Sequence, residues 1–283
     1  MTARVRQILK STAVVVIVIL LAGATYQGVA TAVERRKYPH PGKLVDVGGH
    51  QLHIYCTGEH PARGAGTVIL EAPEGGMSAE WGWVQATVSR THRVCSYDRA
   101  GLGWSEAGDR PFDPGRVPEE LHQLLRNADV TGPYVLVGQS LGAAFARLFA
   151  ARYPRDVTGL ILIDFPTADA PNDTRMAAAF PWLARTGLLR ASGMWADRAE
   201  GLPEQDAGVL RSFLNRPDHL TRASREFARW TQGVTLSTDA KLGDGLSVRT
   251  LTLRPGGLND PLHAKRVAAV LPRLGTLTMK RPN

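Results

Sequence analysis

Short apolar segments alternate along the chain with longer stretches of helical composition. The segments at 67–72, 93–98, 134–137 and 159–164 are built around β-branched and other apolar residues, which predicts buried strands. Strands of this kind that alternate with helices predict a mostly parallel sheet with helices on both faces. The predicted fold class is therefore α/β.

The N-terminal segment 1–37 has a different pattern. Residues 11–33 contain no charge, and 13–22 are strongly apolar. A helix of this length spans about 34 Å, enough to cross a bilayer core, so we expect one N-terminal transmembrane helix. The alternatives are a cleaved signal peptide, since 22–24 and 30–32 have the small-x-small cleavage pattern, and a buried soluble helix.

Charge adds to this picture. The net charge is +8, and residues 1–37 supply +5 of it, so the basic residues flank the apolar segment. This distribution does not predict a nucleic-acid partner. Arg4, Arg6 and Lys10 favour an N-terminus kept inside, with the domain beyond the cell membrane, whereas the basic residues at 35–37 oppose that orientation.

The candidate chemistry lies in Gly138-Gln139-Ser140-Leu141-Gly142, between the strand at 134–137 and a helical stretch at 145–152. In the order strand, tight turn, helix, this motif presents a serine nucleophile. Side chains at Gly138 and Gly142 would collide with neighbouring backbone, and the Leu141 N–H at the helix start can face a developing oxyanion.

The segments 45–56, 71–76, 97–105 and 138–142 resemble the opening hairpin, oxyanion loop, post-strand loop and nucleophile elbow of the α/β-hydrolase fold. The resemblance covers roughly residues 43 to 280. Within this family, the chain resembles a membrane-anchored branch of actinobacterial hydrolases. It implies a serine hydrolase acting on a small molecule with an ester or related acyl bond. We expect no cofactor, because the sequence contains no phosphate loop and no dinucleotide-binding glycine motif. Ser140 disfavours the aspartate-nucleophile enzymes of this fold.

The same resemblance makes the Glu74 N–H the second oxyanion donor. Pro73 stands where this loop is expected to have glycine, and proline has no N–H to donate. We expect the Glu74 carboxylate to point to solvent.

Asp260 is the expected acid of the catalytic triad, because it lies in the loop after a predicted strand at 247–253. Two alternatives remain open. Asp260 precedes Pro261 and can instead cap a helix, and Asp164, at the end of an earlier strand, occupies a position from which some relatives take the acid.

The histidine base should follow the last strand, which we predict at 275–280, shortly before the chain ends at Asn283. His263 is one helical turn from Asp260, too close for the usual geometry, and His219 falls in the predicted lid. We therefore expect a C-terminally shortened family member without the final base loop and helix. Its function is either a serine esterase or a catalytically crippled binding or scaffold protein.

The domain is expected to cover 38–283, with a helical lid at about 166–245 that separates two strands. Cys56 and Cys95 fall on strands that are neighbours in this fold, so a disulfide is expected in an oxidising compartment, with two buried thiols as the alternative. The sequence contains no metal-binding spacing of Cys and His, and it leaves the oligomeric state open.

Overall fold

The computed structural model describes residues 3–59, 66–168, 174–253 and 257–271. Its centre is a seven-stranded sheet in the order β1-β2-β4-β3-β5-β6-β7. The first two strands pair antiparallel and the others run parallel. The strands are β1 Lys43–Asp46, β2 Gln51–Thr57, β3 Thr67–Glu71, β4 Val94–Tyr97, β5 Tyr134–Gln139, β6 Val157–Ile163 and β7 Ser247–Leu251.

Helices cover both faces of this sheet, as the sequence pattern predicts. Successive side chains of a strand point to opposite faces of the sheet, so alternate residues pack into two separate hydrophobic cores. Leu136 packs with α3 (Val117–Asn127) and α4 (Leu141–Arg152), whereas Val137 packs with α2 (Gly82–Val88) and α10 (Pro261–Val270). The strands are therefore apolar on both sides, and the α/β class is confirmed.

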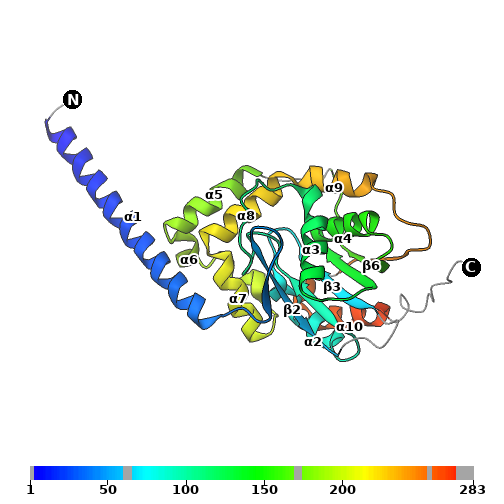
Figure 1. The fold of residues 1–283 in the computed structure, drawn as a ribbon. Coiled ribbons are helices and arrows are strands. Elements are labelled where there is room, and N and C mark those ends of the chain that lie inside the picture. Colours follow the sequence, from blue (N-terminus) through cyan, green and yellow to red (C-terminus); the bar gives the residue numbers. More distant parts are fainter. Residues whose placement is uncertain (1–2, 60–65, 169–173, 254–256, 272–283) are drawn as a thin grey trace, which may run out of the picture.

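Between β6 and β7 the chain forms a group of helices, here called the lid. Figure 1 shows α5 to α8 gathered beside α1, with α9 over the body of the domain. Phe213 and Leu210 of the lid pack on Met77, which follows the loop after β3. The lid helices are α5 Thr174–Arg185, α6 Leu188–Ser192, α7 Glu204–Leu214, α8 Pro217–Ala228 and α9 Trp230–Asp239.

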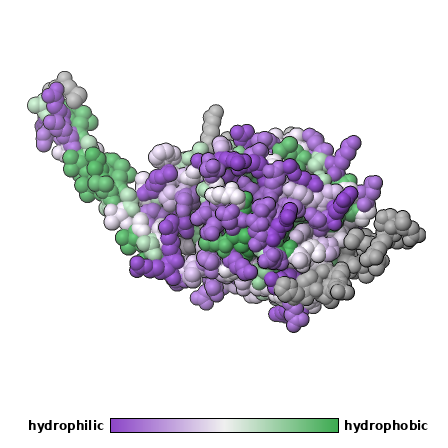
Figure 2. Space-filling view, viewed as in Figure 1, coloured by the Kyte–Doolittle hydropathy of each residue, from purple (hydrophilic) through white to green (hydrophobic). Residues whose placement is uncertain are grey.

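The N-terminal helix α1, Ala3–Lys37, projects from the domain (Figures 1 and 2). In the described part of the chain it is the one helix long and apolar enough to cross a membrane. Its final turns contact the lid. Arg190 donates a 3.0 Å hydrogen bond to Gln27 and pairs with Glu34, while the Gln27 amide donates to the Asn215 carbonyl at 2.7 Å. The N-terminal helix and the lid are thus packed together.

Beneath the loop after β3, the buried guanidinium of Arg99 donates all five of its N–H groups. Two go to Glu226 of the lid at 2.9 and 2.8 Å and one to Glu71 of β3 at 2.7 Å. The other two reach the carbonyls of Ala72 and Pro73, each at 2.7 Å. Because Glu226 also accepts the Gly75 N–H at 2.9 Å, one cation holds the sheet, the loop and the lid together.

The two carboxylates of this network differ in protonation. Burial raises the pKa of Glu71 to about 7, against the lowering effect of Arg99. Burial also works to raise the pKa of Glu226, but the charge and hydrogen bonds of Arg99 outweigh it and the pKa is lowered. Arg99 is therefore balanced mainly by Glu226, and Glu71 is the group that titrates near neutral pH.

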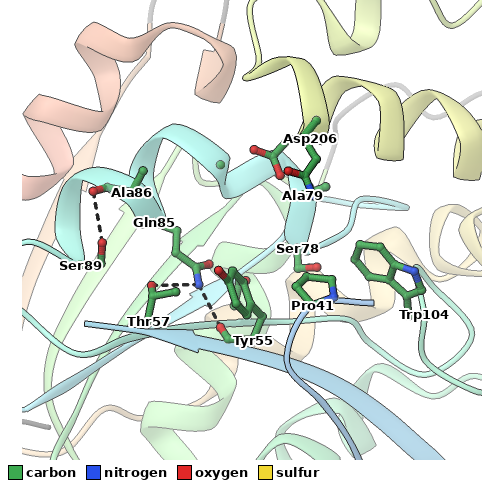
Figure 3. Close-up of a pocket in the computed structure, with 13 residues that line it drawn as sticks. Pro41, Tyr55, Thr57, Ser78, Ala79, Gln85, Ala86, Ser89, Trp104 and Asp206 are labelled. Carbon is green, nitrogen blue, oxygen red and sulfur yellow. Dashed lines mark hydrogen bonds between the residues drawn. The ribbon is translucent and has the colours of Figure 1, made fainter. Parts of the chain in front are cut away.

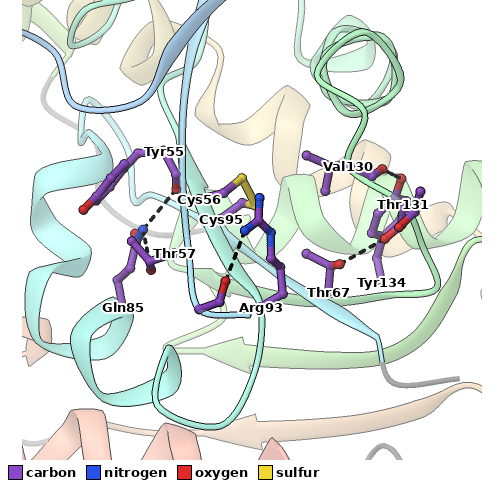
Figure 4. The surroundings of a disulfide bond; sticks show 11 residues. Tyr55, Cys56, Thr57, Thr67, Gln85, Arg93, Cys95, Val130, Thr131 and Tyr134 are labelled. Carbon is purple, nitrogen blue, oxygen red and sulfur yellow. Dashed lines mark hydrogen bonds between the residues drawn. A yellow bond between two sulfur atoms is a disulfide. The ribbon is translucent and has the colours of Figure 1, made fainter. Parts of the chain in front are cut away.

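The cysteines lie directly opposite each other on β2 and β4 and form a disulfide (Figure 4). The bond joins the antiparallel hairpin to the parallel part of the sheet. It closes a loop between residues separated by 39 positions.

Replacing Cys56 and Cys95 together by alanine is expected to lower the free energy of unfolding by about 4 kcal/mol, because the cross-link restricts the unfolded chain. Denaturant unfolding of the full chain in neutral detergent measures this. A reductant should destabilise the wild type and leave the double variant unchanged. Equal sensitivity of the two proteins to reductant contradicts the prediction.

Glu71→Gln is expected to change how stability depends on pH. The folded pKa of Glu71, about 7, lies above its usual 4.5, so the folded protein binds more protons between these values and stability falls as the pH rises through them. Between pH 5 and 8 the wild type should lose up to about 3 kcal/mol relative to the glutamine variant. Parallel stability–pH curves for the two proteins contradict this assignment.

Candidate active site

Ser140 lies at a sharp turn between β5 and α4. Its backbone has φ 51° and ψ −124°, a conformation that residues with a side chain seldom adopt. The Ser140 N–H donates to the Ile163 carbonyl of β6 at 2.9 Å, and its carbonyl accepts the Ala143 N–H at 2.9 Å. The turn is therefore fixed to the sheet on one side and to the helix on the other.

Two glycines make this turn fit between its neighbours. A Cβ at Gly138 would lie 2.5 Å from the Gly142 carbonyl oxygen, and one at Gly142 would lie 2.2 Å from the Ala72 carbonyl oxygen. Both contacts are with backbone, which cannot move aside cheaply. The elbow and the loop after β3 are thus in direct contact only because these side chains are absent.

Ser140 opens into a cavity of about 330 Å³. Its walls come from the loop after β3, the ends of β5 and β6, the lid and the segment before α10. The lining residues are Pro73, Glu74, Glu80, Gln139, Ser140, Asp164, Arg198, Gly257, Leu258 and Asn259.

A second cavity, of about 400 Å³, lies beside α2 (Figure 3). Gln85 crosses it to bond the Tyr55 carbonyl and Thr57, and Asp206 lines its upper wall. It contains none of the predicted catalytic residues, so Ser140 and its smaller cavity mark the candidate site.

The residues predicted as oxyanion donors come from the two segments that meet at the elbow, α4 and the loop after β3. Leu141 is the first residue of α4, where helical N–H groups lack partners within the helix. Glu74 lies in a turn in which the Gly76 N–H bonds the Pro73 carbonyl at 3.0 Å.

The expectation that the Glu74 carboxylate points to solvent is wrong. This side chain is half-buried and lines the Ser140 cavity, and among the described residues its Oε2 atom is buried without a hydrogen-bond partner. The tight turn around Gly75 and the lid packed over it leave the side chain directed inward. Together with Asp164 and Glu80, which pairs with Arg198 at 3.5 Å, it makes the cavity rich in carboxylates.

The two candidate acids occupy different places. Asp260 does not line the Ser140 cavity. Its Oδ1 atom accepts the Leu262 N–H at 2.8 Å and caps α10, the role the sequence left as an alternative because Pro261 follows. Asp164 does line the cavity. It lies at the end of β6 with φ 47°, and its Oδ1 atom accepts the Leu253 N–H at 3.0 Å.

The histidines lie elsewhere in the described part of the chain, which includes all but His60, and none lines the Ser140 cavity. His219 is held between the Gly103 N–H at 3.1 Å and the Gly75 carbonyl at 3.0 Å, and burial lowers its pKa to about 4. The His263 Nδ1 atom bonds the Gly257 carbonyl at 2.5 Å. The predicted last strand at 275–280 lies outside the described residues.

Another buried histidine supports the loop region. His53 contacts Asp98 at 3.0 Å and also the Pro41 carbonyl, and Asp98 accepts the N–H groups of Ser78 and Trp104. Burial alone would lower the pKa of His53, but Asp98 outweighs it and the pKa is raised. No role was assigned to this pair or to Arg99 from the sequence. The signal that could have found them is that Asp98 and Arg99 directly follow the buried strand β4.

The model of the family described as alpha/beta hydrolase fold matches residues 68–235, more than half of the chain. An uncharacterized protein of Schizosaccharomyces pombe is 28% identical over 185 residues, which cover 54% of this chain and 35% of that protein. The putative carbamate hydrolase RutD of Klebsiella pneumoniae is 32% identical over 138 residues, covering 48% of this chain and 49% of RutD. The chain thus spans half or less of these relatives' lengths.

Among solved structures, the enol-lactonase of Burkholderia xenovorans aligns with a TM-score of 0.61 at 19% identity. The alignment covers 82% of this chain and 99% of the lactonase, so it reports a shared fold. The strand order, the elbow at Ser140 and the family match agree, and the chain belongs to the α/β-hydrolase family.

Proposed function

We propose that this chain is a membrane-held hydrolase that cleaves an ester or related acyl bond by nucleophilic attack of Ser140. The observation that carries the proposal is the strained backbone of Ser140, φ 51° and ψ −124°, at the junction of β5 and α4. Strain of this kind persists only where packing enforces it, and it presents a side chain at the end of the sheet.

In the proposed reaction the Ser140 Oγ atom attacks the carbonyl carbon and forms a tetrahedral intermediate. The N–H groups of Leu141 and Glu74 stabilise its oxyanion, and the leaving group departs as the acyl-enzyme forms. Water then attacks the acyl-enzyme and releases the acid. Arg99 and Glu226 contribute by holding the carbonyls and the Gly75 N–H on either side of Glu74.

Asp164 is the acid we assign, in place of Asp260. It shares the cavity with Ser140, whereas the Asp260 carboxylate is engaged at the start of α10. The Asp164 carboxylate can orient an imidazole that enters this cavity, and that imidazole would take the proton from Ser140 and pass it to the leaving group.

The second candidate function is ligand binding without turnover. It is favoured by one observation, that no described histidine lines the Ser140 cavity. A triad without its base retains only the contribution of the oxyanion hole and substrate binding.

The names of two proteins similar to this chain, a carbamate hydrolase and an enol-lactonase, support an acyl compound as substrate. Placement of the domain beyond the cell membrane, with α1 as a single N-terminal pass, is supported by the Cys56–Cys95 disulfide, since such bonds persist in oxidising compartments.

A fluorophosphonate probe should label the full chain at Ser140 and not the Ser140→Ala variant. Labelling should be slow, and free imidazole should accelerate it about tenfold or more by supplying the base that the cavity lacks. In-gel fluorescence over time measures both rates. Absence of labelling in folded protein, with and without imidazole, supports the binding function and contradicts the hydrolase.

Asp164→Asn and Asp260→Asn form a matched pair for the acid. Asparagine can still accept the backbone N–H groups that these aspartates accept, so both variants should fold. Asp164→Asn should lower the imidazole-assisted labelling rate about tenfold or more, because the imidazolium loses its carboxylate. Asp260→Asn should leave that rate unchanged, and the reverse outcome restores Asp260 as the acid.

A further inference from the structure

Arginines gather in one cavity, although residues 38–283 have a net charge of only +3. The cavity measures about 830 Å³ and lies among the end of α1, the lid and the loop after β4. Six arginines line it: Arg35, Arg110, Arg185, Arg216, Arg222 and Arg225. Arginine predominates wherever phosphate is bound, because its planar guanidinium donates two parallel hydrogen bonds.

The two acids that line this cavity, Asp218 and Glu106, are too few to balance its six arginines. Asp218 pairs with Arg216 at 2.6 Å and with Arg35 at 3.7 Å. Glu106 accepts the Gln51 N–H at 2.8 Å. Within the described residues, neither Arg110 nor Arg225 has an ion pair or hydrogen bond, so two exposed cations remain available to an anion.

Two buried polar atoms in the wall also lack a hydrogen bond. These are the Nε atom of Arg222 and the Nε2 atom of His50, each buried without a hydrogen bond among the described residues. Arg222 packs its guanidinium 4.1 Å from the centre of the Phe112 ring and lies 3.9 Å from Glu226. Buried polar atoms without a hydrogen bond can be completed by water or by an ion that enters the cavity.

The Arg35 end of the cavity lies close to the point where α1 would leave a bilayer. Arg35 follows the uncharged run 11–33 of α1 by two residues, and that run spans about 34 Å, slightly more than a bilayer core. Arg185, on another wall, stacks on Trp182 at 4.8 Å. Tryptophan and arginine are favoured at the membrane interface.

The tip of the lid has the matching apolar surface. Trp182 is 70% exposed and Leu188 is 55% exposed. Between them, the Thr186 carbonyl packs against Gly23 of α1, so closely that a Cβ at Gly23 would lie 2.1 Å from it. Only 12 uncharged residues of α1, at 11–22, precede this contact, about 18 Å of helix. The lid tip therefore lies beside the apolar run of α1, so a membrane around the part of the run before Gly23 reaches Trp182 and Leu188 at its surface.

We propose that the arginine-lined cavity binds the phosphate headgroup of an anionic phospholipid in the leaflet next to the lid. The proposal rests on the membrane placement of α1 and not on catalysis at Ser140, because the arginine cavity and the Ser140 cavity share no lining residue. The bound phosphate pairs with Arg110 and Arg225 at the rim, and the lipid tails lie along Trp182 and Leu188.

The test titrates dihexanoylphosphatidylglycerol into the full chain in neutral detergent and follows tryptophan fluorescence. The wild type should bind it, and Arg110→Gln with Arg225→Gln should weaken binding roughly fivefold for each arginine lost. The matched control is Arg90→Gln with Arg155→Gln, two exposed arginines outside the cavity, and it should bind like the wild type. Equal melting temperatures without lipid establish that all three proteins are folded.

Two further titrations identify the source of the phosphate. Dihexanoylphosphatidylcholine, which has no net charge, should bind more weakly, and inorganic phosphate should compete only at much higher concentration than the anionic lipid. The proposal is overturned if the rim variant binds phosphatidylglycerol like the wild type. It is equally overturned if inorganic phosphate binds as tightly as the lipid, since the cavity then takes a soluble anion.

Discussion

The buried guanidinium of Arg99 is the interaction on which the rest of this structure depends. Its five hydrogen bonds end on a strand, on two loop carbonyls and on a lid helix. A buried charge is tolerated only when it is fully paired, so removing any one partner affects the others. The loop that carries Glu74 therefore keeps its shape only while the lid is docked, and the geometry around Ser140 depends on a helix more than eighty residues further along the chain.

The parts of the fold that local pattern determines could be predicted from the sequence. The runs around Leu70, Val137 and Ile161 are apolar on both faces of the sheet, and that pattern has few other solutions. The elbow could also be predicted, because Gly138 and Gly142 are required by contacts with backbone immediately beside them. The α/β class and the position of Ser140 follow from information carried within a few residues.

The rest depends on residues far apart in the sequence. Asp164 and Asp260 both follow strands, and only the packing of α10 shows that Asp260 is occupied as a cap. The Glu74 side chain turns inward because the lid covers its loop. The general tendency of glutamate to be exposed does not predict this orientation. The arginines of the lid, of α1 and of the loop after β4 are dispersed in sequence, so their net charge looks unremarkable until the fold brings them to one cavity.

The packing of α1 against the lid also affects any version of the protein prepared without this helix. A chain that starts after Lys37 loses Gln27 and Glu34, the partners of Arg190, and uncovers the backbone of Thr186 and Gly187. The helices α5 and α6 would then be free to shift against α8, which carries Glu226. Trimming the helix would therefore alter the order of the network under the loop after β3, and measurements on the trimmed domain would describe a different arrangement from that of the full chain.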